Sequence, residues 1–151
     1  MQPMGAVAVR REIHDTIIDQ GPQHAPEFFH GYTYSAHPAA CAAGLATLAI
    51  FDREASFERA CALGARLDER VFELAGLGCV ADVRCYGLFA AVELRTRDGA
   101  PGLAGHEAQK RLFDAGLHLK ATGDALLVAP AFVYEPEQID ELVGILREVL
   151  G

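Results

Sequence analysis

Apolar residues recur at steps of three and four positions in two stretches of the second half of the chain. In the stretch that follows Ser56 they are Ala60, Leu63, Leu67, Val71 and Leu74. In the stretch that follows Pro136 they are Ile139, Leu142, Val143, Leu146 and Val149. These spacings predict two amphipathic helices, one capped by Ser56 and the other started by Pro136. Gly76 and Gly78 should end the first.

Between the two helices the apolar period changes to two, which is typical of strands. After Val80, the positions on one face of the predicted strand are Leu88, Ala90, Val92 and Leu94. Beyond an Asp98-Gly99 turn, the chain predicts a helix at 106–115 and two strands at 117–119 and 125–129. Because these elements do not alternate as parallel units, we expect an antiparallel sheet covered by helices, an α+β domain within the broader α/β class.

The first 55 residues carry weaker patterns. Residues 5–9 indicate a short buried strand, residues 10–18 a helix, and residues 19–34 mostly loop. The helix that starts at Pro38 is rich in alanine and glycine in its first turns. Small residues at that density allow another backbone to approach closely, so we expect a buried face, packed inside the domain or against another subunit.

Composition and charge narrow the class of protein. The chain is 51% hydrophobic and 23% charged, which is typical of a globular domain. Its formal net charge of −8 argues against nucleic acid or an anionic membrane as partner. The sequence shows neither a transmembrane stretch nor a signal-peptide pattern, so we expect a cytoplasmic protein.

The cysteines and histidines suggest little chemistry of their own. The four cysteines form no C-x-x-C pair, so buried free thiols are expected rather than metal ligands or disulfides. His30 and His37 lie seven residues apart across a turn, a spacing that favours structural hydrogen bonds over metal binding. Ser35 lacks the Gly-x-Ser-x-Gly context of a serine hydrolase. No metal site is predicted.

The segment at residues 30–38, His-Gly-Tyr-Thr-Tyr-Ser-Ala-His-Pro, is the best candidate for a binding site. Gly31 permits close backbone approach, the Thr33 hydroxyl can donate a hydrogen bond, and the positive end of the following helix lies beside them. Such a loop can hold an anion such as a phosphate. From the residues alone, a simple helix-capping loop is the alternative.

The string HGYTYSAHPAACAAGLATL at residues 30–48 closely resembles the loop and helix of class III pyridoxal-phosphate aminotransferases. Within that family it resembles the omega-amino acid–pyruvate (beta-alanine–pyruvate) group. Further segments resemble the family in the same order, at 3–7, 83–88, 97–101, 122–124 and 138–140. The resemblance implies a fold-type I enzyme, with residues 1–55 ending the large cofactor domain and forming a linking helix, and residues 56–151 forming the small domain.

In that family, the lysine that carries the cofactor precedes the region that this chain resembles. The two lysines of this chain, Lys110 and Lys120, lie in other contexts. We therefore expect the C-terminal portion of a transaminase, with no catalytic residue of its own. The resemblance assigns Tyr32 and Thr33 to the phosphate of pyridoxal 5'-phosphate in the neighbouring subunit, which implies a homodimer or a dimer-based oligomer.

Lys120 lies at the end of a predicted strand, beside Thr122-Gly123-Asp124. The family usually places there an arginine that receives the substrate carboxylate. Arginine grips a carboxylate with two parallel hydrogen bonds, whereas lysine offers a flexible point charge. Lys120 is therefore either a weaker carboxylate contact or a surface residue.

The resemblance implies transfer of an amino group from an omega-amino acid or amine to a keto acid such as pyruvate. Two alternatives stay open. One is a catalytically inactive module that assembles with a separately encoded N-terminal half. The other is a different pyridoxal-phosphate reaction on the same scaffold, such as that of an aminomutase or a decarboxylase.

Overall fold

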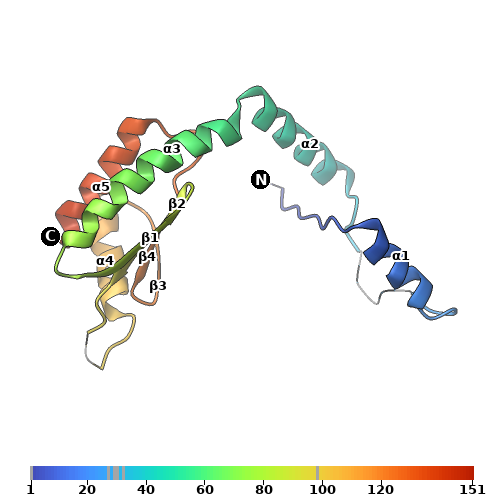
Figure 1. Ribbon diagram of the computed structural model, residues 1–151, viewed down its shortest axis with the longest axis horizontal. Helices are drawn as coiled ribbons and strands as arrows, with labels where there is room; N and C mark the ends of the chain where they lie inside the picture. Colours follow the sequence, from blue (N-terminus) through green and yellow to red (C-terminus); the bar gives the residue numbers. More distant parts are fainter. Residues whose placement is uncertain (1, 27, 29–30, 32, 98) are drawn as a thin grey trace. The chain divides into compact units, whose positions relative to one another are not determined.

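The chain forms two compact units, Met1–Glu54 and Ala55–Gly151, called below the N-terminal and C-terminal units. Figure 1 shows the computed structural model, which describes every residue except 1, 27, 29–30, 32 and 98. That the two units belong to the large and small domains of an intact enzyme, as the predicted domains 1–55 and 56–151 imply, remains a prediction.

Two helices form the regular structure of the N-terminal unit among its described residues. They are α1, Arg11–Gln20, and α2, Pro38–Arg53, and both helices were predicted. The backbone N–H of Ala40 donates to Nδ1 of His37 at 3.4 Å, so this histidine caps α2. Pro38 follows in the first turn, where its missing N–H costs no helical hydrogen bond.

Within the described residues of the N-terminal unit, one predicted strand is absent and one predicted buried face is not buried inside the unit. Residues 5–9 form no strand, and Val7 is 90% exposed, because no described segment of this unit pairs with them. The small-residue face of α2 is largely exposed too, with Ala40 its one buried residue and Leu45 and Leu48 in solvent. The alternative that this face meets another subunit remains a prediction.

The C-terminal unit combines a four-stranded sheet with helices (Figure 1). In chain order its elements are α3 (Ser56–Val71), the 3-10 helix η1 (Phe72–Gly76), β1 (Val80–Tyr86), β2 (Phe89–Leu94), α4 (Leu103–Asp114), β3 (Lys120–Thr122), β4 (Ala125–Val128) and α5 (Pro136–Leu150). The strand order is β1-β2-β4-β3 with every pairing antiparallel, so β3 is an edge strand. The predicted antiparallel sheet covered by helices is confirmed.

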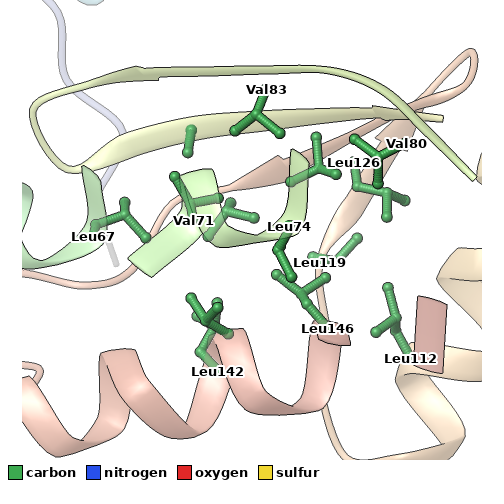
Figure 2. Packing of buried hydrophobic residues seen from close by; sticks show 14 of the residues in the cluster. Leu67, Val71, Leu74, Val80, Val83, Leu112, Leu119, Leu126, Leu142 and Leu146 are labelled. Carbon is green, nitrogen blue, oxygen red and sulfur yellow. The ribbon is translucent and has the colours of Figure 1, made fainter. Parts of the chain in front are cut away.

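One face of the sheet packs on the helices and forms the core. Along β2, Ala90, Val92 and Leu94 are buried, whereas Phe89 on the other face is 50% exposed. Figure 2 shows the strand side chains meeting those of α3, η1, α4 and α5, among them Leu67, Val71, Leu74, Leu112, Leu142 and Leu146. The apolar residues that alternate along the strands and those that recur every three or four positions along the helices therefore pack into a single core.

Helices α3 and α5 lie beside each other and run in the same direction. Arg59 near the start of α3 pairs with Glu135 at the start of α5 (2.6 Å), and Glu73 just beyond α3 pairs with Arg147 near the end of α5. Midway, Arg66 donates two hydrogen bonds to Asp140, at 3.0 and 2.8 Å. These bonds hold the pKa of Asp140 below its usual range.

Local details of the C-terminal unit correct other expectations. Ala55 is the N-cap of α3 with a left-handed backbone (φ 46°), and Ser56 is the first helical residue without a capping bond. Residues 117–119 are not a strand, since the pairing with β4 begins at Lys120. The cysteines of this unit were expected to be buried, but Cys61 is exposed, and Cys79 and Cys85 are half-buried.

Candidate functional site

Thr33 lies in a turn that immediately precedes α2. Residues 33–36 form the turn, and Ala36 has a left-handed backbone (φ 56°) that redirects the chain toward the helix. Thr33 is exposed, and its hydroxyl has no hydrogen-bond partner among the described residues. Tyr32, the other predicted phosphate contact, lies outside the described residues. The Thr33 hydroxyl is therefore available to an external acceptor.

A hollow of about 320 Å³ beside this turn tests whether a phosphate fits. Its described lining includes Gly5, Gly31, Thr33 and Ser35, and no carboxylate is among the described lining residues. The N-terminus of α2 contributes Ala40 to the same wall. Hydroxyls, backbone donors and a positive helix end favour an anion, so these residues fit the phosphate group of pyridoxal phosphate.

Lys120 is the first residue of β3 and faces away from the core. It lies opposite Leu127 of β4 in the antiparallel register and is exposed. Its ammonium has no ion-pair partner among the described residues. A hollow of about 340 Å³ adjoins it, and the walls include the apolar side chains of Phe89, Leu117, Leu127 and Tyr134. The side chain is thus a free cation beside an apolar surface.

Asp124 lies in the turn between β3 and β4, and the sequence did not predict its role. It is buried, with 9% exposed, and accepts hydrogen bonds from the backbone N–H of Gly102 (3.0 Å), from that of Gly105 (3.2 Å) and from the hydroxyl of Thr96 (2.8 Å). These donors, chiefly the Gly102 N–H, lower the pKa of Asp124. Asp124 therefore caps α4 and anchors the β3–β4 turn to it.

Among the described residues, the remaining candidate side chains form no metal site, and His37 has a structural role. His37 caps α2, while His30 lies outside the described residues. No three His, Cys, Asp or Glu side chains gather into a possible metal site among the residues that the structure describes. Likewise, none of the described helices has the length and apolar character that crossing a membrane requires.

The fold and the phosphate-compatible turn agree with one family. The sequence model of the class III aminotransferases matches residues 2–150, so the chain belongs to the class III aminotransferase family. Members of this family use pyridoxal phosphate, which confirms the predicted cofactor class. The fold class predicted from the resemblance is confirmed as well.

Two relatives support the predicted resemblance to the omega-amino acid–pyruvate group. An omega-aminotransferase of Caulobacter vibrioides is 44% identical over 149 residues, covering 99% of this chain and 34% of that protein. A beta-alanine–pyruvate aminotransferase of Pseudomonas aeruginosa is 42% identical over 150 residues, with the same coverage of 99% and 34%. The chain thus spans about a third of the length of these curated relatives.

Solved transaminase structures share the fold. One from a study of directed evolution by ancestral reconstruction has a TM-score of 0.83 at 32% identity, covering 94% of this chain and 33% of that one. The omega transaminase of Pseudomonas jessenii in complex with PMP has a TM-score of 0.75 at 29% identity, covering 81% of this chain and 28% of that one.

Proposed function

We propose that this chain forms part of a pyridoxal-phosphate-dependent transaminase that moves an amino group from an omega-amino acid or amine to a keto acid such as pyruvate. The observation that carries the proposal is the family match over residues 2–150. The 44% identity to an omega-aminotransferase supports the proposed substrate class. A cytoplasmic location, and the large- and small-domain assignment of residues 1–55 and 56–151, belong to the same proposal.

In this proposal, Thr33 and Tyr32 hold the cofactor phosphate of the neighbouring subunit in a homodimer or dimer-based oligomer. The exposed, unpartnered Thr33 hydroxyl and the carboxylate-free described lining of its hollow support the role of Thr33. The transfer chemistry itself is supplied by bound pyridoxal phosphate. This turn binds and orients the phosphate, and no residue of the chain is assigned the catalytic lysine's part.

Lys120 is proposed to bind the substrate carboxylate. Its support is the free, exposed ammonium at the start of β3, beside an apolar hollow that can accept the carbon chain of a substrate. Because the contact lies away from the reacting carbon, it contributes equally to binding of substrate and transition state. It should therefore influence KM more than kcat.

A chimera tests the proposal. Residues 2–150 replace the matching segment of the Caulobacter vibrioides omega-aminotransferase, and the conversion of beta-alanine and pyruvate to alanine is measured. We expect turnover, with one alanine formed per donor consumed. A folded chimera that binds pyridoxal phosphate without turnover would favour the inactive assembly module. Release of carbon dioxide from the donor, or its isomerisation, in the absence of pyruvate would favour a different reaction.

A further inference from the structure

The backbone at Lys120 is held by a side chain of a neighbouring helix. Nε2 of Gln109 on α4 donates a hydrogen bond to the carbonyl oxygen of Leu119 at 3.1 Å. That carbonyl belongs to the planar peptide group whose other end is the nitrogen of Lys120. The bond therefore fixes the plane from which the Lys120 backbone continues into β3.

The residues on both sides of this peptide are held as well, and the Gln109 bond adds a restraint on the rotation of the peptide between them. The side chain of Leu119 is buried, with 8% exposed, and Lys120 is paired with Leu127 in the sheet. The strand is only three residues long and lies at the edge, so it has neighbours on one side alone. A short edge strand gains few ladder bonds, and a side-chain bond has correspondingly more effect.

Helix α4 secures β3 at both ends. Before the strand, Gln109 holds the carbonyl of Leu119, and after it, Asp124 bonds to the backbone N–H groups of Gly102 and Gly105 at the start of α4. Helix and strand are in direct contact in the C-terminal unit. The position of Lys120 is thus coupled to α4 by two independent sets of hydrogen bonds.

We infer that Gln109 is a positioning residue for Lys120 and thereby sets the affinity for carboxylate-bearing substrates. The inference rests on the proposed role of Lys120. A lysine ammonium on a four-carbon stem is flexible, so the direction in which it leaves the backbone decides where it can reach. Gln109 touches no reacting group in this arrangement and acts only through the Leu119–Lys120 peptide.

The test compares two variants that both remove the donor from Gln109. In the chimera, Gln109→Met removes the N–H donor without adding charge. Gln109→Glu removes the donor while keeping the shape of the side chain. At saturating pyruvate, we expect either variant to raise KM for beta-alanine about threefold to tenfold, since an ordinary hydrogen bond contributes about that much. The value of kcat, and KM for an amine that lacks a carboxylate, should stay unchanged.

A double-variant comparison separates positioning from a general structural effect. In a Lys120→Ala background, Gln109→Met should raise KM no further, because the residue that it positions is gone. Lys110→Met on the same helix serves as the control. Lys110 is exposed and has no ion pair with a described residue, so its loss should leave both KM values unchanged.

Three results would overturn the inference. An effect of Gln109→Glu without one of Gln109→Met would show that added charge, not the lost donor, is responsible. A carboxylate-selective effect of Lys120→Ala without one of the Gln109 variants would remove the inference and leave the proposed role of Lys120 intact. Equal responses of both donors to Lys120→Ala would remove that role and the inference with it.

Discussion

The Thr33 hydroxyl carries the proposed phosphate contact, and its loss should be measurable. A hydrogen bond to a charged group contributes about 1.5–3 kcal/mol, so Thr33→Ala in the chimera should weaken pyridoxal-phosphate binding about tenfold to a hundredfold. Fluorescence titration of the cofactor measures this. Thr47→Ala is the control, since the Thr47 hydroxyl bonds to the carbonyl of Ala43 within α2. Unchanged affinity in Thr33→Ala would reduce Thr33 to a loop residue.

Lys120→Arg offers a gain-of-function test at the second site. A guanidinium can pair with a carboxylate through two parallel hydrogen bonds, so we expect KM for beta-alanine to fall by about threefold to tenfold. An amine without a carboxylate should respond little, and kcat should hold. Steady-state kinetics of the chimera with both donors provide the measurement. An equal change for the two donors would contradict carboxylate recognition.

Asp124 should make the stability of the C-terminal unit depend on pH. Its hydrogen bonds hold the pKa below the unfolded value of about 3.9, so the stabilisation is complete above that pH and is lost as the pH falls through the folded pKa. Thermal unfolding followed by circular dichroism should show Asp124→Asn less stable than the parent at pH 7, with the gap narrowing in acid.

Asp114→Asn is the matched control for Asp124. Asp114 is exposed at the opposite end of α4, where a negative charge is unfavourable to the helix dipole. Its replacement should not lower the unfolding temperature. A gap between Asp124→Asn and the parent that stays constant down to pH 2 would show that the ionised carboxylate is not what stabilises the cap.

At the scale of the elements, we expect alanine substitutions at two helical glycines to change the stability of the C-terminal unit in opposite directions. A Cβ on Gly105 of α4 would lie 2.1 Å from the carbonyl oxygen of Gly123, so Gly105→Ala should destabilise the unit by about 1–3 kcal/mol. A Cβ on Gly144 of α5 meets nothing within 4 Å, so Gly144→Ala should stabilise it by about 0.5–1 kcal/mol. Urea unfolding measures both, and equal effects would contradict the close approach of α4 to the β3–β4 turn.

Elements with a strong local pattern could be predicted from the sequence. The five residues of the apolar stripe predicted for α5 are all buried, and the alternation in β2 matches its burial: the five are Ile139, Leu142, Val143, Leu146 and Val149. The strand predictions for 5–9 and 117–119 were wrong, because a strand requires a paired strand. The sequence of a short segment does not show whether such a pairing strand exists. The start of β3 at Lys120 follows from its register with β4.

The candidate site, too, contains residues that could be predicted from the sequence and residues that could not. The turn before α2 could be predicted because glycine, threonine and proline follow one another in the sequence. Asp124 and Gln109 could not, because their partners lie up to 28 and 10 residues away and meet them only once α4 packs against β3. Sequence reasoning therefore found the residues proposed to touch ligands and missed those that hold the backbone around them.

At the scale of the whole molecule, the 151-residue chain alone should show no transaminase turnover. Its two lysines, Lys110 and Lys120, are both exposed, whereas a lysine that forms a Schiff base with a cofactor is activated in a desolvated pocket or beside another cation. Incubation with pyridoxal phosphate and borohydride, followed by mass spectrometry, should give at most slow labelling spread over both. A saturable one-to-one adduct on either lysine would contradict this expectation.

The parallel pairing of α3 with α5 has a consequence for the newly made chain. Contacts such as that of Arg66 with Asp140 join residues 74 positions apart, and the apolar faces of both helices meet in one core. While the ribosome is still adding α5, the apolar face of α3 has no helix to cover it. The C-terminal unit therefore cannot complete its folding until α5 has been synthesised, and the apolar face of α3 lacks this cover until then.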